Sequence, residues 1–249
     1  MYTDFAGAYV PFFEASSMIW LLGDPHGKFD YIITMVKTHR PDAIIFLGDL
    51  ECPLPLDVLL RPILTLTEVW FIHGNHDSDR GSYWHNLHGN GLAERNLHGR
   101  VATVAGHRVA GLGGTFEAPV WLPGEPDTGI QNYQEFLNRL NLRHQPADVV
   151  ATKKQHSLSH IYPDDYFCLG MEQADILVCH EAPSCHPYGY TEIDDLATTM
   201  GVKQVFHGHH HDSLDYRKSW ASMGFETYGV GFRGIMDLQG NVLHTHPTR

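Results

Sequence analysis

The sequence has few cysteines and few basic residues, and both shortages narrow what the protein can do. Its four cysteines show no CxxC spacing, which argues against a disulfide framework or a structural zinc site and favours reduced thiols in a cytoplasm. Seventeen Lys and Arg stand against 29 Asp and Glu, and the formal net charge of −12 makes a long nucleic acid an unlikely partner. A small anionic substrate remains compatible with this charge, because bound cations offset it locally.

Long apolar runs are also missing. No stretch approaches the length of a membrane span. The first eighteen residues contain Asp4 and Glu14 but no Lys or Arg, which does not match a secretory signal. We therefore expect a soluble, cytoplasmic protein that does not enter a membrane. The sequence leaves its oligomeric state open.

Five short apolar runs of strand character recur along the chain, and each is followed by polar residues. The first three alternate with other stretches, including a helix expected at residues 29–39, and so form a β-α-β-α-β run. Because the runs are apolar almost throughout, they indicate a parallel sheet covered on both faces. The five runs are residues 19–22, 43–47, 69–72, 176–179 and 205–206.

Further strands are expected in the second half of the chain. Residues 101–104 and 108–112 have the pattern of a hairpin, and residues 225–229, 234–238 and 242–244 have that of a closing meander. Two mixed sheets packed face to face, with helices outside, account for both halves. The predicted fold class is therefore α/β.

The chain length and the spacing of the predicted strands indicate the domain organisation. With 249 residues, of which 43% are hydrophobic, the chain can bury a full core, and we expect residues 1–249 to form one domain. Between about 115 and 170 the strand rhythm stops, and helices are expected at 133–142 and 147–161. We interpret this segment as an inserted helical cap.

The residues after the apolar runs are those that bind transition metals. In open α/β sheets, ligand sites form beyond the carboxyl ends of the strands, so separated segments converge on one place. Nineteen histidines, more than Lys and Arg together, add to the supply of ligands. The segments are Asp24-Pro25-His26, Gly48-Asp49, Gly74-Asn75-His76-Asp77, His180 and Gly208-His209-His210-His211.

These ligands divide into two sets. Asp24 and His26 are two residues apart and can reach one ion together, while Asp49 can place one oxygen on each of two ions. The mixture of nitrogen and oxygen donors suits Mn, Fe, Zn or Co better than Ca or Mg, and we expect Mn first. The first set is completed by His211, and the second consists of Asn75, His180 and His209.

A site of this kind predicts phosphoester chemistry. Two divalent ions beside only two anionic ligands leave a positive site that attracts a phosphate ester. Such ions activate a hydroxide for attack on phosphorus and stabilise the developing charge. His76 lies next to a ligand and is a candidate general acid for the leaving oxygen, and Asp77 is a candidate to orient its ring.

The five segments resemble the calcineurin-like metallophosphoesterase family, whose pattern is DxH, GD, GNH[DE], a lone His and GHxH, each after a strand. The resemblance covers about residues 19 to 237. It implies a four-layer αββα sandwich and the ligand sets above, with Asp49 bridging and His76 near the leaving group. One difference follows Glu51, where Cys52 stands in place of an Asp or Asn that many relatives carry. Another is the segment after His180, which differs from the common His-x-Pro-Pro form.

Several other histidines have ordinary explanations. His207 and His210 alternate with the expected ligands and should point away from the ions, and His73 is more typical of packing. The loop with His186 and Tyr188 either contacts substrate or is an ordinary aromatic-rich loop.

We therefore expect a dinuclear metal-dependent hydrolase of a small phosphomonoester, phosphodiester or nucleotide. One alternative is a nuclease of the same fold, which the acidic composition disfavours. The other is a non-catalytic protein-binding scaffold, which missing ligands or a missing His76 would favour. This chain has all of the expected ligands and His76.

Overall fold

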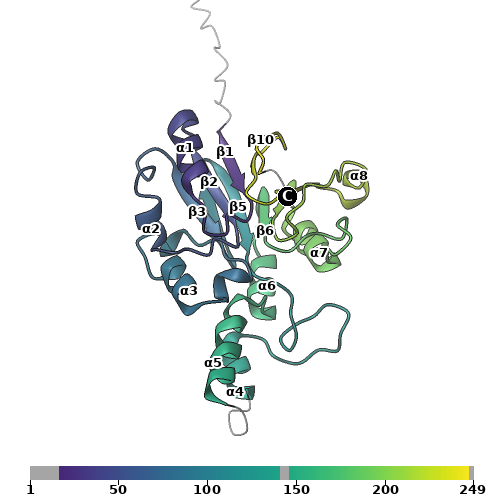
Figure 1. Ribbon diagram of the computed structural model, residues 1–249. Helices are drawn as coiled ribbons and strands as arrows, with labels where there is room; N and C mark the ends of the chain where they lie inside the picture. The colour runs from purple at the N-terminus through teal and green to yellow at the C-terminus, as the bar shows by residue number, and fades with distance from the viewer. Residues whose placement is uncertain (1–16, 141–145, 247–249) are drawn as a thin grey trace, which may run out of the picture.

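The computed structural model describes residues 17–140 and 146–246, which form two five-stranded sheets with helices around them (Figure 1). The first sheet has the order β10-β9-β1-β2-β3. Its strands β1 to β3 run parallel, whereas β9 is antiparallel to both of its neighbours. The strands are β1 (Ile19–Leu22), β2 (Ala43–Leu47), β3 (Glu68–Ile72), β9 (Ile235–Asp237) and β10 (Val242–His244).

The second sheet has the order β4-β5-β6-β7-β8. The strands from β5 to β8 are parallel, and only β4 is antiparallel, because it forms the predicted hairpin with β5. Both sheets are therefore mixed, as expected. The strands are β4 (Arg100–Val104), β5 (His107–Leu112), β6 (Ile176–Cys179), β7 (Gln204–His207) and β8 (Glu226–Gly229).

Successive side chains of a strand point to opposite faces of its sheet, and so contact different layers of the fold. In β1, Ile19 and Leu21 pack into a core between the two sheets, while Trp20 and Leu22 pack toward helices on the outer face. Both faces of the strand are thus buried, which explains its unbroken apolar sequence. The first sheet is covered by α1 (Asp30–His39), α2 (Leu56–Leu59) and α3 (Gly81–His88), and the second by α6 (Pro163–Gly170) and α7 (Thr191–Met200). The predicted four-layer αββα sandwich is confirmed.

The predicted closing meander is wrong. Its first strand, β8, pairs in parallel with β7 in the second sheet, whereas β9 and β10 form a hairpin on the first sheet. The chain changes sheets between them and passes directly over the end of β1. A Cβ atom on Gly23 would lie 2.3 Å from the Val230 carbonyl oxygen, so this crossing requires a glycine.

The inserted segment carries α4 (Tyr133–Arg139) and α5 (Ala147–His156), which extend away from the sandwich (Figure 1). It has a small apolar cluster of its own, which includes Val120, Phe136 and Tyr162. The helix expected at 133–142 ends earlier, and its residues 141 and 142 lie outside the described ranges. The helix expected at 147–161 ends at His156, and the 3-10 turn η4 (Ser157–Ser159) follows it.

The short helix α8 (Trp220–Met223) lies before β8. Across residues 17–140 and 146–246, no helix combines the length and apolar character that crossing a membrane requires.

Candidate metal centre

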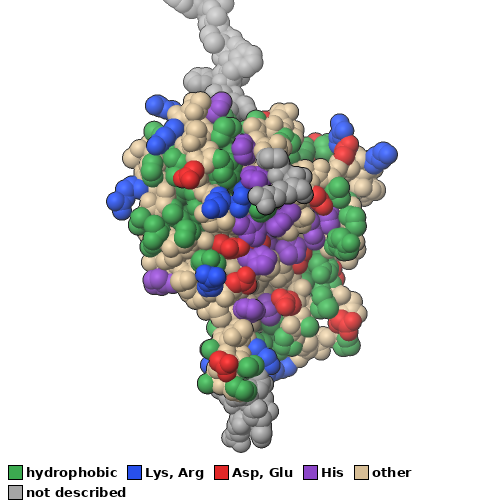
Figure 2. Space-filling view, viewed as in Figure 1, with side chains coloured by type: hydrophobic (Ala, Val, Ile, Leu, Met, Phe, Trp, Pro, Cys, Tyr) green, Lys and Arg blue, Asp and Glu red, His purple; other side chains and the backbone are tan. Residues whose placement is uncertain are grey.

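The predicted ligands lie on loops that follow β1, β2, β3, β6 and β7, and five of them have a left-handed backbone. For a residue other than glycine this conformation costs about 1–3 kcal/mol and persists where the surrounding structure imposes it, often at functional sites. Histidine side chains gather near the centre of this face, with acidic side chains beside them (Figure 2). The left-handed residues are Asp24 (φ 38°), His26 (φ 42°), Asp49 (φ 50°), His209 (φ 69°) and His211 (φ 61°).

The residues expected to form the first ligand set lie close together. Asp24, His26, Asp49 and His211 each offer a ligand atom within 4.8 Å of the others. The Nε2 atoms of His26 and His211 lie 3.0 Å apart, and the His26 Nε2 atom is 3.8 Å from Asp49 Oδ2. Glu51 contacts the other ring nitrogen of His26, Nδ1. A carboxylate in that position orients a metal-binding imidazole and raises its basicity.

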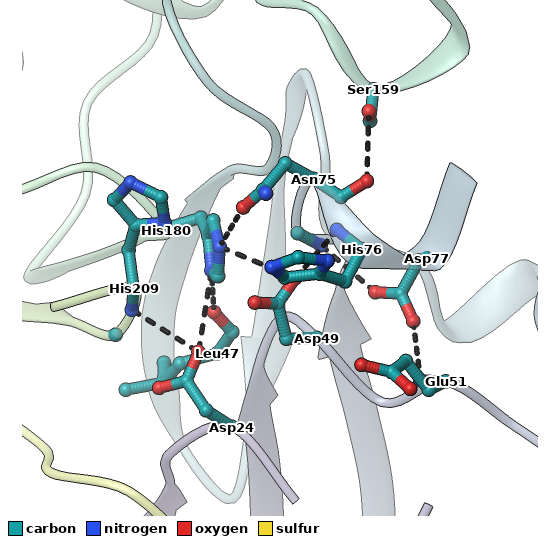
Figure 3. A network of polar contacts seen from close by, with 12 residues as sticks. Asp24, Leu47, Asp49, Glu51, Asn75, His76, Asp77, Ser159, His180 and His209 are labelled. Carbon is teal, nitrogen blue, oxygen red and sulfur yellow. Dashed lines mark hydrogen bonds and ion pairs between the residues drawn. The ribbon is translucent and has the colours of Figure 1, made fainter. Parts of the chain in front are cut away.

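The second set shares Asp49 with the first. Asp49, His180 and His209 offer ligand atoms within 4.8 Å of one another. The His180 ring is held by its Nδ1 atom, which lies 2.7 Å from the Leu47 carbonyl oxygen. Its Nε2 atom therefore faces the centre, 3.1 Å from Asn75 Oδ1 and 3.5 Å from Asp49 Oδ1 (Figure 3). Asn75 thus joins the second set.

Two glycines allow these loops to approach so closely. A Cβ atom on Gly48 would lie 2.3 Å from His180 Nδ1, and one on Gly74 would lie 2.3 Å from Asp49 Oδ1. Gly48 also has a φ of 104°, which side chains rarely tolerate. The glycines that precede Asp49 and Asn75 therefore serve the geometry of the centre.

The buried carboxylates of the centre provide a negative charge that a cation would stabilise. The Oδ2 atoms of Asp24 and Asp49 are buried and have no hydrogen-bond partner among residues 17–140 and 146–246. Burial raises the pKa of Asp24 to about 8, although the neighbouring His180 lowers it. Burial lowers the pKa of His180, but the carboxylates of Asp49 and Asp24 raise it more, to about 10. Protons and metal ions would therefore compete for these two residues.

The structure corrects the predicted contact between Asp77 and the His76 ring. The 3-10 turn η1 (His76–Ser78) buries Asp77, whose Oδ1 and Oδ2 atoms accept hydrogen bonds from the backbone N–H groups of Glu51 (2.7 Å) and Gly74 (2.9 Å). The carboxylate beside His76 is that of Asp79, which is 2.7 Å from Nδ1. Burial lowers the pKa of His76, but Asp79 and other carboxylates raise it more, so it ends above its usual value.

The remaining histidines mostly pack against other rings. His73 is buried against Trp84 and His98, and His207 lies 3.2 Å from the Tyr216 hydroxyl. His210 stacks on the buried His186, with ring centroids 3.8 Å apart. Tyr188, on the same loop as His186, is exposed.

Sequence reasoning missed the place of Glu181 in the site. Glu181, His209 and His210 offer ligand atoms within 4.8 Å of one another, so this buried carboxyl borders the second set. One of its oxygens, Oε1, accepts a hydrogen bond from the backbone N–H of Phe116. Its position directly after His180 was the available signal.

Comparison with known proteins identifies the family. Residues 17–213 match the family model for calcineurin-like phosphoesterases, and the chain belongs to this family. A protein of Haemophilus influenzae, described only as an uncharacterized protein, is 40% identical over 230 residues, which are 91% of this chain and 96% of that protein. The crystal structure of TT1561 from Thermus thermophilus is similar in fold, with a TM-score of 0.54 and 17% identity over 91% of this chain and 96% of that chain.

Membership in this family supports metal-dependent phosphoester hydrolysis as the class of activity. The family uses divalent metal ions, and the three groups of possible ligands among the described residues are consistent with that.

The tandem histidines provide a test of the ligand sets. His209 and His211 belong to different sets, whereas His210 belongs to neither and stacks on His186. His210 does share a third group of possible ligand atoms with Glu181 and His209, so it is the informative control. We expect His209→Ala and His211→Ala each to lower the metal content by about one ion per chain, and His210→Ala to leave it unchanged. Elemental analysis of reconstituted protein measures this, with circular dichroism to check folding. Equal losses in all three variants would refute the assignment.

Proposed function

We propose that the protein hydrolyses a small phosphomonoester, phosphodiester or nucleotide with the aid of two transition metal ions. The observation that carries this proposal is the pair of ligand sets joined at Asp49. Asp24, His26 and His211 would hold one ion with Asp49, and Asn75, His180 and His209 would hold the other.

The donors present fit such ions. Two buried carboxylate oxygens lack hydrogen-bond partners within the described part of the chain, and histidine nitrogens and an amide oxygen lie nearby. This mixture favours Mn, Fe, Zn or Co, and we propose Mn first. Bound ions of this kind supply Lewis acidity, which activates water and stabilises charge on the phosphoryl group.

The protein's own proton donor would be His76. Its side chain is 44% exposed, so a substrate can reach it, and its ring centroid lies 5.5 Å from that of His26. Because Asp79 engages Nδ1, Nε2 is the nitrogen that would donate a proton to the leaving oxygen. The carboxylate also fixes the ring orientation and favours the protonated form. In this proposal Asp79 takes the role expected of Asp77, and Asp77 holds the loops together.

Two rival functions fit less well. A nuclease would track a phosphate backbone, which a chain with a net charge of −12 is poorly suited to do. A scaffold without turnover has no need of grouped ligand atoms, and the two groups that share Asp49 support the metal-dependent proposal instead.

We also propose that the protein is cytoplasmic and forms a single domain. The four cysteines are unpaired thiols, which suits a cytoplasmic protein. A shared core between the two sheets supports a single domain that carries an insertion at about 115–170.

Metal removal tests the proposed function. Chelation should abolish hydrolysis of the protein's best ester, chosen from a panel of p-nitrophenyl phosphate, bis-p-nitrophenyl phosphate, cyclic nucleotides and dinucleoside polyphosphates. Added Mn should restore the rate most fully among Mn, Fe, Zn and Co. Hydrolysis that persists in thoroughly chelated protein would contradict the proposal. Faster cleavage of single- or double-stranded nucleic acid than of any small ester would favour the nuclease instead.

A further inference from the structure

Two buried serines join the inserted segment to the loop that carries Asn75. Ser78 lies on the turn η1, directly after the segment Asn75-His76-Asp77, and Ser159 lies on the turn η4 at the end of α5. Their Oγ atoms are 2.6 Å apart, and both side chains are almost fully buried. Figure 3 shows Ser159 beside the Asn75 backbone, on the side away from His180.

Both hydroxyl groups reach the same two carbonyl oxygens. The Asn75 oxygen lies 3.0 Å from Ser78 Oγ and 3.4 Å from Ser159 Oγ. The His156 oxygen lies 3.2 Å and 3.1 Å from the same two atoms. Each hydroxyl has one proton, and the contact between the two Oγ atoms uses one of them. The other proton goes to one carbonyl, and the shortest of these distances favours a bond from Ser78 to Asn75.

The backbone holds the same junction from the other side. Gly114, at the start of the insertion, donates its N–H to the His73 oxygen at 2.8 Å, and Thr115 donates to the Ser159 oxygen at 3.0 Å. A Cβ atom on Gly114 would lie 2.1 Å from that Ser159 oxygen, and its φ of 86° also requires glycine. The start of the insertion and the turn η4 are therefore both fixed to the loop that runs from His73 to Ser78.

One peptide group connects this junction to the centre. The carbonyl of Asn75 that faces the serines and the N–H of His76 belong to the same peptide, which is planar. That N–H donates to Asp49 Oδ1 at 2.9 Å. The plane is thus held on one side by the Ser78 hydroxyl, which the Ser159 hydroxyl contacts in turn, and on the other by the shared carboxylate. Its orientation sets the direction of the Asn75 amide and the His76 ring.

We propose that Ser78 and Ser159 are positioning residues that hold Asn75 and His76 in place for metal binding and proton donation. This inference rests on the proposed function, because it assigns Asn75 to the second ion. The inserted segment would then form part of the support of the catalytic loop rather than only an addition to the sandwich.

The chain offers a matched control. Ser157 lies on the same turn η4 and is fully buried, but its Oγ atom bonds to the Lys154 oxygen at 3.1 Å and not to Asn75. Ser157→Ala therefore removes a buried hydroxyl from the insertion without touching the catalytic loop. A general loss of stability should affect Ser157→Ala and Ser159→Ala alike, whereas a positioning effect should appear only in the second.

The test is Mn binding to full-length metal-free protein, measured by titration calorimetry. Loss of an outer contact to a ligand typically weakens metal affinity by about 10–100-fold. We expect a loss at the low end of that range for the second ion in Ser78→Ala and Ser159→Ala, and wild-type affinity in Ser157→Ala. The double variant Ser78→Ala/Ser159→Ala should lose little more than the worse single one, because the two hydroxyls act as a unit.

Wild-type affinity for both ions in Ser159→Ala would overturn the inference, as would an equal loss in Ser157→Ala. Circular dichroism confirms folding, and if Ser78→Ala does not fold, Ser159→Ala decides the question alone, because it leaves the turn η1 unchanged and removes the hydroxyl that holds Ser78 Oγ in place. The binding result is independent of turnover. Wild-type protein that binds two Mn ions but hydrolyses no ester would defeat the proposed function and leave this test valid.

Discussion

Asp49→Asn is expected to reduce ester hydrolysis to the level of the chelated protein and to leave fewer than two ions per chain. Both ligand sets include the Asp49 carboxylate, and one of its oxygens is buried without a hydrogen-bond partner. The amide has the same shape but no charge, so each ion loses an anionic ligand. Activity at limiting Mn and elemental analysis measure the two effects.

A nearby carboxyl that lies in neither ligand set provides the control for this variant. Asp79→Asn makes the same chemical change close by and should retain both ions. Circular dichroism and thermal unfolding would show whether each variant keeps its fold. Full activity of Asp49→Asn at limiting Mn would remove the dinuclear model.

His76→Ala should retain both ions but lose about 10²–10⁴-fold in rate on esters with poor leaving groups, which is the usual scale of general acid catalysis. Nitrophenolate leaves with little need of a proton, so the loss should shrink as the pKa of the leaving group falls. The measurement is kcat/KM over a series of esters whose leaving groups differ in pKa. A variant equally impaired on all of them, with both ions present, would contradict the acid role and indicate substrate positioning.

Substitutions of the two carboxyl groups near His76 should have different effects in the same series of esters. Asp79 contacts the His76 ring, so Asp79→Asn should show a milder form of the His76→Ala dependence. Asp77 bonds only to backbone N–H groups of Gly74 and Glu51, so Asp77→Asn should lower thermal stability and metal content instead.

Much of the fold and the ligand grouping could be predicted because they depend on local patterns. Strands buried on both faces, such as β1 and β2, read as short unbroken apolar runs, and parallel strands bring their carboxyl ends together. The residues that follow, such as Asp24 and Asp49, were therefore recognisable as neighbours in space. Both residues lie in one group of possible ligand atoms, and Asp49 also lies in a second.

The remaining features depend on backbone geometry that the sequence does not display. The prediction placed Asp77 against His76 because they are adjacent, but the 3-10 turn carries residue 77 inward and brings Asp79 to the ring. The sequence also does not show which distant segments contact each other. Ser159 reaches Asn75 across 84 positions, and β8 joins the second sheet although it precedes the β9–β10 hairpin closely in sequence.

The most direct test is a crystal structure of the Mn-loaded protein in which anomalous scattering locates the ions. We expect two peaks roughly 3.5–4 Å apart, as in other two-metal sites, and both in contact with the Asp49 carboxylate. His26 and His211 should contact one ion, and His180 and His209 the other. A single peak, or two peaks that do not share Asp49, would contradict the dinuclear centre.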